Sequence, residues 1–437
     1  MDTGHLPSTR MTGRWDTPGC NLAAATTAVA ADSLNARFYG RIQYPGPPVV
    51  FERVVERGFW SRMLAQDIGY WGESIVTDRS EIWVAGCGAN QALITALRFP
   101  EAQVLGSDLS EQSLDICRRN STALGLGNLE LRHESINDRV YVNRFDYVVC
   151  TGVIHHNADP KATLRGLAKA LTPHGVLELM VYNQYHRICS SAVQLAVRTM
   201  TGTLASPDLE QEASVAKQLA ETFDTGGPIA MFLSRFRDQP FVYFADTLLQ
   251  PIEHSFTVAS LRDMAADCGL ELLGCVVDHF SRARGAIDWN MSFRDPELRN
   301  RYENLSDTDR WQITNYLLLE DSPMLWFYLQ KMDSPRIRRG ERAMSQDVLA
   351  RRCRRNRTHK EMFGQLDDGS YSTVPTRIPF PPALPSNPVA YRLYQSLDES
   401  VPLSQTFAKL GLDVSFKTVH PLRIQLATSA YPFLSVA

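Results

Sequence analysis

The stretch EIWVAGCGANQALITALRF, residues 81–99, decides the fold. It reads as a short apolar strand, a turn built on Gly86 and Gly88, and the start of a helix. Glycines without a Cβ let a ligand approach the backbone, and the helix start adds the positive end of a dipole. The stretch therefore predicts a nucleotide-binding turn. Gln91 stands where the dinucleotide fingerprint has a glycine or alanine, which argues against NAD.

Strands and helices alternate along the chain after this turn. Apolar strands are expected at 81–85, 102–108, 129–134, 144–150 and 175–182, with helices at 90–98, 111–124 and 161–171. Such runs are typical of a parallel sheet covered on both faces, and right-handed crossovers make it doubly wound. The predicted class is therefore α/β. A helix ended by Gly269 and a further strand follow within 257–277, and 286–293 is the expected seventh strand.

The whole chain divides into five expected parts. They are an N-terminal arm or lid (1–75), the sheet domain (76–295) with a helical insertion at 183–257, a helical extension (296–334), a basic and then proline-rich linker (335–388), and a small C-terminal module (389–437). The last part reads as three helices followed by strands, which suits a winged-helix-like module. In the arm, aromatic residues lead into a Pro-Gly-Pro-Pro turn, so it either packs on the next domain or forms a lid over a ligand pocket.

Composition excludes several classes of protein. The 437 residues are 44% hydrophobic and 21% charged, with a net charge of −3, so no global charge favours nucleic acid or a membrane. Residues 335–360 hold ten Lys or Arg against two acids, where a solvated linker or charged helix is favoured over a nucleic-acid contact. Eight cysteines form no C-x-x-C pair, and no signal peptide or membrane span is expected. A cytoplasmic protein with reduced thiols is the prediction.

Asp108 is the next marker of the ligand. It ends the second strand, where a carboxylate can accept both hydroxyl hydrogens of a ribose. The alternative is an N-cap of the following helix, although Ser110 is better placed for that role. No pair of Lys or Arg lies near the glycine turn to hold a pyrophosphate. A site that can bind a ribose but has no cations for a pyrophosphate favours S-adenosylmethionine over NAD.

The stretch RFDYVVCTGVIHHNADP, residues 144–160, follows as the fourth strand and the loop after it. Together with the glycine turn and Asp108, it resembles the class I S-adenosylmethionine-dependent methyltransferases, over roughly residues 81–182. The N-terminal aromatic arm and the helices after strand five resemble one branch of that family. The resemblance implies a mostly parallel, seven-stranded Rossmann-like sheet and S-adenosyl-L-methionine as cofactor.

The resemblance also implies the cofactor contacts. Gly86, Cys87 and Gly88 would face the methionine part, Asp108 the ribose, Leu109 the adenine, and Thr151 and Gly152 the sulfonium. The residue near the adenine amine is left open among Glu134, Ser135 and Ile136. The family often carries an acid just before its first glycine, and here that position is Ala85.

Catalytic and substrate contacts are assigned by position in the fold. The catalytic candidates are His155, His156 and Tyr182, although the two histidines are better explained by packing than by base catalysis. Residues that follow the strand ends or lie in the arm and insertion would line a substrate pocket. These candidates, each with packing as its alternative, are Tyr39, Tyr44, Asn183, Tyr185, Arg187, Tyr243 and His254. No cluster has metal-ligand spacing, so no metal is expected.

The predicted function is methyl transfer to a small organic molecule, in specialised metabolism, by in-line displacement at the sulfonium methyl. Three alternatives stay open. The same cofactor could support aminocarboxypropyl transfer or cyclisation, the acceptor could be RNA or protein, or the chain could bind the cofactor without catalysis. Nucleic-acid and membrane partners are not expected, and a homodimer is possible.

Overall fold

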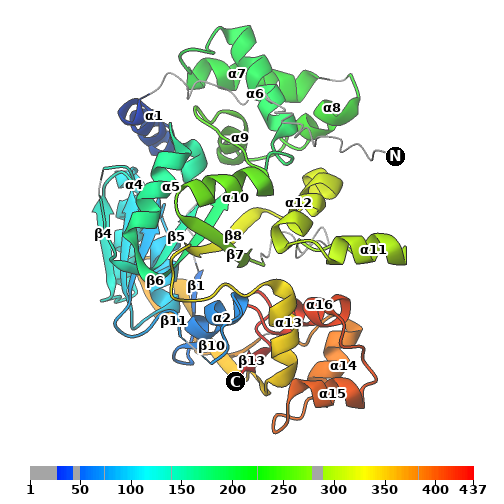
Figure 1. The fold of residues 1–437 in the computed structure, drawn as a ribbon. Helices are drawn as coiled ribbons and strands as arrows, with labels where there is room; N and C mark the ends of the chain where they lie inside the picture. The colour runs from blue at the N-terminus through cyan, green and yellow to red at the C-terminus, as the bar shows by residue number, and fades with distance from the viewer. Residues whose placement is uncertain are drawn as a thin grey trace, which may run out of the picture.

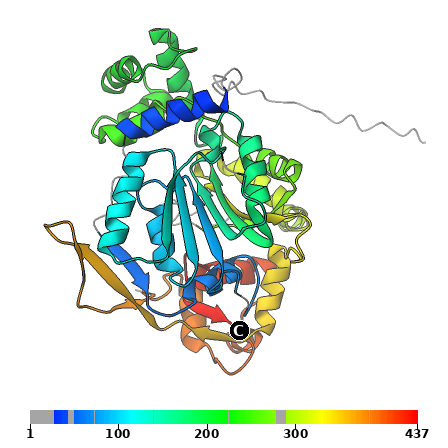
Figure 2. The same ribbon diagram turned by 90° about the vertical axis from the view of Figure 1, so that its left-hand side faces the viewer.

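The computed structural model describes residues 27–42, 50–72, 74–138, 140–223, 225–277, 289–381 and 383–437. A central sheet carries helices on both faces (Figure 1). The helical insertion and helix α1 lie at one end of the strands, and the C-terminal elements lie at the other end, as the perpendicular view also shows (Figure 2).

The central sheet has seven strands in the order β4-β3-β2-β5-β6-β8-β7. Their bounds are β2 Glu81–Ala85, β3 Gln103–Asp108, β4 Leu129–His133, β5 Phe145–Thr151, β6 Leu171–Val181, β7 Leu270–Cys275 and β8 Leu325–Lys331. Strand β8 is antiparallel to both of its neighbours, and the pairs among β2–β6 are parallel. The predicted doubly wound, mostly parallel α/β class is confirmed.

The seventh strand was predicted in the wrong place. Residues 286–288 lie outside the described residues, and residues 289–293 form no strand. The missing strand is β8, which is inserted between β6 and β7 and extends the sheet beyond the expected domain end at 295. Its sequence, LWFYLQK, is buried on both faces and so lacks the alternation that marks a strand. The expected helical extension is helical in α11 (Pro296–Glu303) and α12 (Asp307–Leu318).

Two sets of helices cover the sheet. One face packs against α2 (Phe59–Asp67), α3 (Gln91–Arg98) and α4 (Glu111–Ala123), and the other against α5 (Pro160–Ala170), α10 (Val258–Asp267) and α12. Successive strand residues point to opposite faces. Accordingly Val84 packs with Leu93 of α3, whereas Trp83 belongs to the core that contains Leu164 of α5.

The helical insertion expected after strand five is present. Its helices are α6 (Ile188–Thr201), α7 (Leu209–Thr222), α8 (Gly227–Ser234) and α9 (Phe241–Leu248). They share an apolar core with α1 (Ala28–Arg41), in which Phe38 contacts the cluster of Val193, Val197 and Phe244. Helix α1, in dark blue, lies between the insertion and the end of the sheet (Figure 2).

Residues 335–388 are not a linker, which corrects that prediction. They form α13 (Glu341–Ala350), β9 (Cys353–Arg355) and a small sheet in which β10 (Thr358–Gln365) pairs with β1 (Val50–Val54), β11 (Tyr371–Thr373) and β12 (Ile378–Phe380). The basic residues have internal partners. Arg338 pairs with Asp307 at 2.9 Å, Arg339 with Asp347 at 2.7 Å, and Arg355 with Glu399 at 2.9 Å. The charges therefore join segments of the fold.

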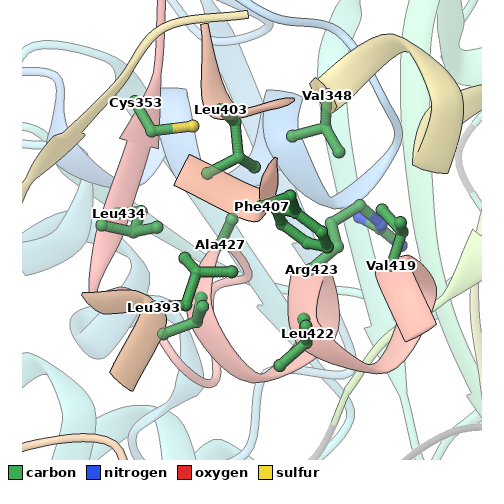
Figure 3. A pocket seen from close by; sticks show the side chains of 11 residues that line it. Val348, Cys353, Leu393, Leu403, Phe407, Val419, Leu422, Arg423, Ala427 and Leu434 are labelled. Carbon is green, nitrogen blue, oxygen red and sulfur yellow. The ribbon is translucent and has the colours of Figure 1, made fainter. Parts of the chain in front are cut away.

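The C-terminal module contains α14 (Pro388–Ser396), α15 (Leu403–Lys409), α16 (Phe416–Leu426) and the strand β13 (Leu434–Val436). Because β13 pairs with β9, which precedes the module, a winged-helix-like fold is not confirmed. Apolar side chains of these elements converge around Phe407 (Figure 3). The space left between them is about 10 Å³, at most enough for one water, so this is a packed core.

Candidate active site

The glycine turn after β2 is fixed to the neighbouring strand. The backbone N–H groups of Gly86 and Cys87 donate to the Ser107 carbonyl at 2.8 and 2.9 Å. Gly86 has φ +70° and Gly88 has φ +52°, in the left-handed region that favours glycine. A Cβ on Gly86 would lie 2.4 Å from Val153, whereas one on Gly88 would meet no described atom within 4 Å. Gly86 is thus required by packing, and Gly88 leaves the backbone accessible.

Asn90, the residue just before helix α3, was not predicted as a cofactor contact. Its side chain is buried, and among the described residues neither its amide nitrogen nor its amide oxygen has a hydrogen-bond partner. A buried amide without partners costs about 1–3 kcal/mol, so a ligand with both a donor and an acceptor is favoured here. The ammonium and carboxylate of a methionine moiety provide both.

Asp108 faces the same turn from the end of β3. Its two carboxylate oxygens accept hydrogen bonds from the backbone N–H groups of Gly88 and Ser110, each at 2.8 Å. Burial nevertheless raises the pKa of Asp108. Ser110 supplies the N-cap of α4 by accepting from the Ser113 N–H at 3.2 Å. The position beside Gly88 is therefore consistent with a ribose contact, with Leu109 next to it in the chain.

The three candidates for the adenine side follow β4. Ser135 donates its hydroxyl to Asp32 of α1 at 2.6 Å, and Glu134 accepts from the Tyr141 hydroxyl at 2.6 Å. Ile136 packs against the core around Trp83. Two of the three side chains therefore already have protein partners, and Ser135 in addition anchors α1.

Thr151 and Gly152 at the end of β5 lie close to the glycine turn. The Gln91 side-chain amide donates to the Thr151 hydroxyl at 2.6 Å, which joins the start of α3 to β5. Gly152, with φ +79°, donates its N–H to the Met180 carbonyl at 3.1 Å. Gln91 therefore argues against a dinucleotide and also holds Thr151 in place beside the glycine turn.

His155 and His156 form the short 3-10 helix Ile154–His156 after β5. Nδ1 of His156 lies 2.8 Å from the Ile252 carbonyl, so this nitrogen carries the proton and Nε2 keeps its lone pair. Burial lowers the pKa of His156 to about 4. The fully buried His155 ring stacks on Tyr182 at 3.8 Å, and neither of its nitrogens has a partner among the described residues. Burial lowers the pKa of His155 well below its usual value, and the neighbouring His156 lowers it further.

Helix α1 crosses this group of residues. Asn35 donates to the His156 carbonyl at 2.7 Å, and the Tyr39 hydroxyl accepts from Gln250 at 2.6 Å. The ring of Tyr39 lies 6.4 Å from that of His156. This placement favours the lid interpretation of the arm over a surface arm. Tyr44 lies outside the described residues.

Asn183 and Arg187, two predicted substrate contacts, have internal partners. Asn183 donates to the Ser322 hydroxyl at 2.9 Å and accepts from the Tyr185 N–H at 3.1 Å. Arg187 forms a buried, two-pronged ion pair with Glu253 and lies over the Tyr182 ring at 4.5 Å. For both residues, these contacts support the packing alternative.

The other substrate candidates are spread over a wider region. Tyr185 contacts Tyr316 of α12 edge to face at 6.4 Å, and Tyr243 on α9 is 46% exposed. His254 donates its backbone N–H to the His155 carbonyl at 2.8 Å, which places it beside the histidine pair. Asp246 of α9 lies next to Gln250, and burial raises its pKa to about 6. The structure therefore gathers Tyr39, Tyr182, His155, His156 and His254, and leaves Tyr185 and Tyr243 apart from them.

The described part of the chain has neither a metal-binding cluster nor a membrane-spanning helix. No three or more His, Cys, Asp or Glu side chains within it are arranged to hold a metal ion. None of its helices is both long enough and apolar enough to cross a bilayer.

Comparison with known proteins agrees with this geometry. Residues 85–223 match the family model described as a methyltransferase domain. The chain carries a class I S-adenosylmethionine-dependent methyltransferase domain. S-adenosylmethionine is the cofactor of this domain, and the turn fits it through the unpaired amide of Asn90, the open backbone at Gly88 and the carboxylate of Asp108.

Relatives with known sequences match part of the chain. An uncharacterized protein of Synechococcus is 26% identical over 55% of this chain and 57% of its own length. The ubiquinone biosynthesis O-methyltransferase of Idiomarina loihiensis is 35% identical over 23% of this chain and 41% of its own length. The matches therefore span about half the length of these curated relatives.

The fold is also similar to that of a solved structure. PKMT2 from Rickettsia typhi aligns with 89% of this chain and 76% of its own chain, with 16% identity and a TM-score of 0.55. That protein has also been solved in complex with AdoHcy. The likeness covers the methyltransferase domain together with much of the chain outside it.

Proposed function

We propose that this chain transfers the methyl group of S-adenosylmethionine to a small organic acceptor held beneath α1. The observation that carries the proposal is the position of α1. Asp32, Asn35 and Tyr39 join this helix to the loop after β4, to the histidine pair and to the insertion. Because α1 is held at these three places, it would cover the acceptor and leave room only for a small molecule.

The charges around the acceptor position favour a nitrogen nucleophile. The rings of Tyr39, Tyr182 and His156 lie next to one another, and aromatic faces attract cations. Glu253 is neutralised by Arg187, whereas Asp246 has no such ion pair among the described residues. One uncompensated carboxyl group beside aromatic rings suits an amine.

Different residues of the domain would bind the cofactor, orient the acceptor and accept its proton. S-adenosylmethionine, when bound, supplies an activated methyl group on its sulfonium. Asn90 and Asp108 would bind its two ends, and α1 would exclude water. The aromatic rings would orient the acceptor for in-line attack, since most of the rate gain in such a displacement comes from positioning. Nε2 of His156, which the Ile252 carbonyl keeps unprotonated, would accept the proton that the nucleophile loses.

Methyl-labelled S-adenosylmethionine tests the proposal. The protein is incubated with a small-molecule filtrate of a cell extract and, separately, with the desalted protein and RNA of the same extract. We expect label in low-molecular-weight products and formation of S-adenosylhomocysteine. Methylthioadenosine in its place would show aminocarboxypropyl transfer or cyclisation. S-adenosylhomocysteine binding no tighter than NAD binding would overturn the cofactor assignment.

A protein or RNA acceptor is the second candidate. It is favoured by one observation, that the fold likeness to PKMT2 extends to 89% of this chain and so beyond the methyltransferase domain. Label confined to the desalted macromolecular fraction would favour this candidate and contradict a small acceptor. Nuclease and protease treatment of that fraction would then distinguish RNA from protein.

A further inference from the structure

A cavity lies between the methyltransferase domain and the C-terminal part of the chain. Its volume is about 500 Å³, within the range of small-molecule sites. Helix α2, the end of α3, strand β10, the segment after β12 and the segment from α16 to β13 contribute to its lining. These elements lie at the end of the sheet away from α1 and the insertion (Figure 1). The cavity is therefore separate from the proposed methyl-transfer site.

One wall of this cavity consists of paired cations and aromatic rings. Trp60 and Phe380 lie side by side with ring centroids 6.0 Å apart. The Arg98 guanidinium lies 4.9 Å from the Trp60 centroid, and Lys360 Nζ lies 4.3 Å from the Phe380 centroid. Tyr431, Phe433 and several prolines add further apolar surface. The wall thus offers flat apolar surface and positive charge at the same place.

The charges of the lining do not cancel. Glu52 is the acidic residue in the lining, and its carboxylate pairs with Lys360. Arg98 is exposed and forms no ion pair within 4 Å among the described residues, although its charge acts on the partly buried Glu178. A guanidinium on an indole ring keeps its N–H donors at the edge, where they can bind a carboxylate or phosphate in a two-pronged arrangement. The cavity lining therefore has one cation, Arg98, that no acid of the lining pairs with.

We propose that this cavity binds a small planar aromatic molecule that carries an anionic group. The ring would pack against Trp60, Phe380 and Tyr431, and the anion would bind Arg98. Each part of the ligand is needed, since an anion alone leaves the apolar walls unfilled and a neutral or cationic ring leaves Arg98 unpaired. The site belongs to neither the cofactor nor the acceptor of the methyl transfer.

Three probes separate these requirements. Indole-3-acetate carries a ring and an anion, tryptamine carries the same ring and a cation, and acetate is an anion without a ring. Binding is measured by calorimetry and by ligand-observed NMR, with saturating S-adenosylhomocysteine present so that the cofactor site is blocked. The full-length chain is compared with Arg98→Gln and with Arg119→Gln. Arg119 is a matched control, because it is an exposed helical arginine without a described acid partner.

We expect saturable binding of indole-3-acetate, at least tenfold weaker binding in Arg98→Gln, and unchanged binding in Arg119→Gln. Tryptamine and acetate should bind at least tenfold more weakly than indole-3-acetate. Circular dichroism and thermal midpoints confirm that each variant is folded, and Trp60→Leu gives a second test from the aromatic side. No saturable binding of indole-3-acetate, or equal binding by Arg98→Gln, would overturn the proposal.

Discussion

His155 and His156 are adjacent in the chain but differ in their hydrogen bonds. His156 donates to the Ile252 carbonyl, whereas both ring nitrogens of His155 lack described partners. Replacing an unpaired buried polar ring by an apolar ring of similar shape is neutral or stabilising, whereas removing one partner of a buried hydrogen bond costs about 1–3 kcal/mol. We therefore predict that His155→Phe keeps or raises the free energy of unfolding and that His156→Phe lowers it. Urea denaturation measures both.

The same two variants separate packing from catalysis. If His156 accepts the proton of the nucleophile, His156→Phe should also lower kcat, by about 10²- to 10⁴-fold, as loss of a general base does. His155→Phe should change kcat little. Equal loss of activity in both variants would contradict the assignment of the base to His156.

Asp108 gives the sharpest test of the cofactor site. Asp108→Asn should weaken S-adenosylhomocysteine binding by about 10- to 100-fold, the effect of losing hydrogen bonds to a charged group worth about 1.5–3 kcal/mol. Isothermal titration calorimetry measures the change. Asp115→Asn is the matched control, because Asp115 lies on the adjacent helix α4 and pairs with Arg118 at the surface. Equal affinities in the two variants would remove Asp108 from the ribose site.

Single residues of the site were predictable where backbone geometry constrains them. Gly86, Gly88 and Asp108 follow from the strand-turn-helix pattern, because only certain residues fit a left-handed turn and a strand end. Asn90 was missed, since an asparagine after a glycine turn reads as an ordinary helix start. Arg187 was assigned to substrate because its partner Glu253 lies 66 residues away, beyond the reach of sequence patterns.

At the scale of elements, the buried pair of Arg187 and Glu253 joins the start of the helical insertion, just before α6, to the segment that follows α9. Breaking such a pair leaves an uncompensated buried charge and costs about 3–5 kcal/mol. Glu253→Gln should therefore lower the free energy of unfolding by this amount, measured by chemical denaturation. Glu297→Gln is the control, because Glu297 and Arg301 are both 74% exposed and such surface pairs contribute at most about 1 kcal/mol. Similar losses in the two variants would show that the Arg187 pair is not buried in solution.

Most elements of the sheet domain were predictable, and the exceptions share a cause. The strands β2–β7 and the helices α3–α5 lie close to their expected positions, except that β6 begins at Leu171 and not at 175, because amphipathic periodicity and glycine ends mark them. Strand β8 and the elements of residues 335–388 were not found. Both depend on partners far away in the sequence: β8 on β6, and β10 on β1.

At the scale of the whole molecule, Asp67 joins three parts of the fold. Its carboxylate accepts from the Tyr328 hydroxyl of β8 at 3.0 Å and from the backbone and hydroxyl of Ser429 near the C-terminus at 2.9 and 2.6 Å. Burial raises the pKa of Asp67 to about 6. Protonation of Asp67 is therefore linked to the stability of the fold in which α2, β8 and the C-terminal segment meet.

The sign of that linkage follows from the raised pKa. Between about pH 4 and pH 6 the folded state holds the Asp67 proton more tightly than the unfolded state, so the Asp67 contribution to stability falls as pH rises. A shift of about two pH units corresponds to at most about 3 kcal/mol. We predict that the free energy of unfolding falls more steeply with pH across this window in the wild type than in Asp67→Asn. Parallel curves from denaturation at a series of pH values would contradict the prediction.

The pairing of β1 with β10 has a consequence during protein synthesis. Val50 pairs with Gly364 and Val54 with Lys360, so the two strands are separated by roughly 300 residues of chain. At about 5–20 residues per second, a ribosome takes about 15–60 s to add that length. For that time the nascent chain carries β1 without its partner, with open backbone donors and acceptors that strands of other nascent chains can pair with. The order of translation therefore leaves β1 open to such pairing until β10 has been made.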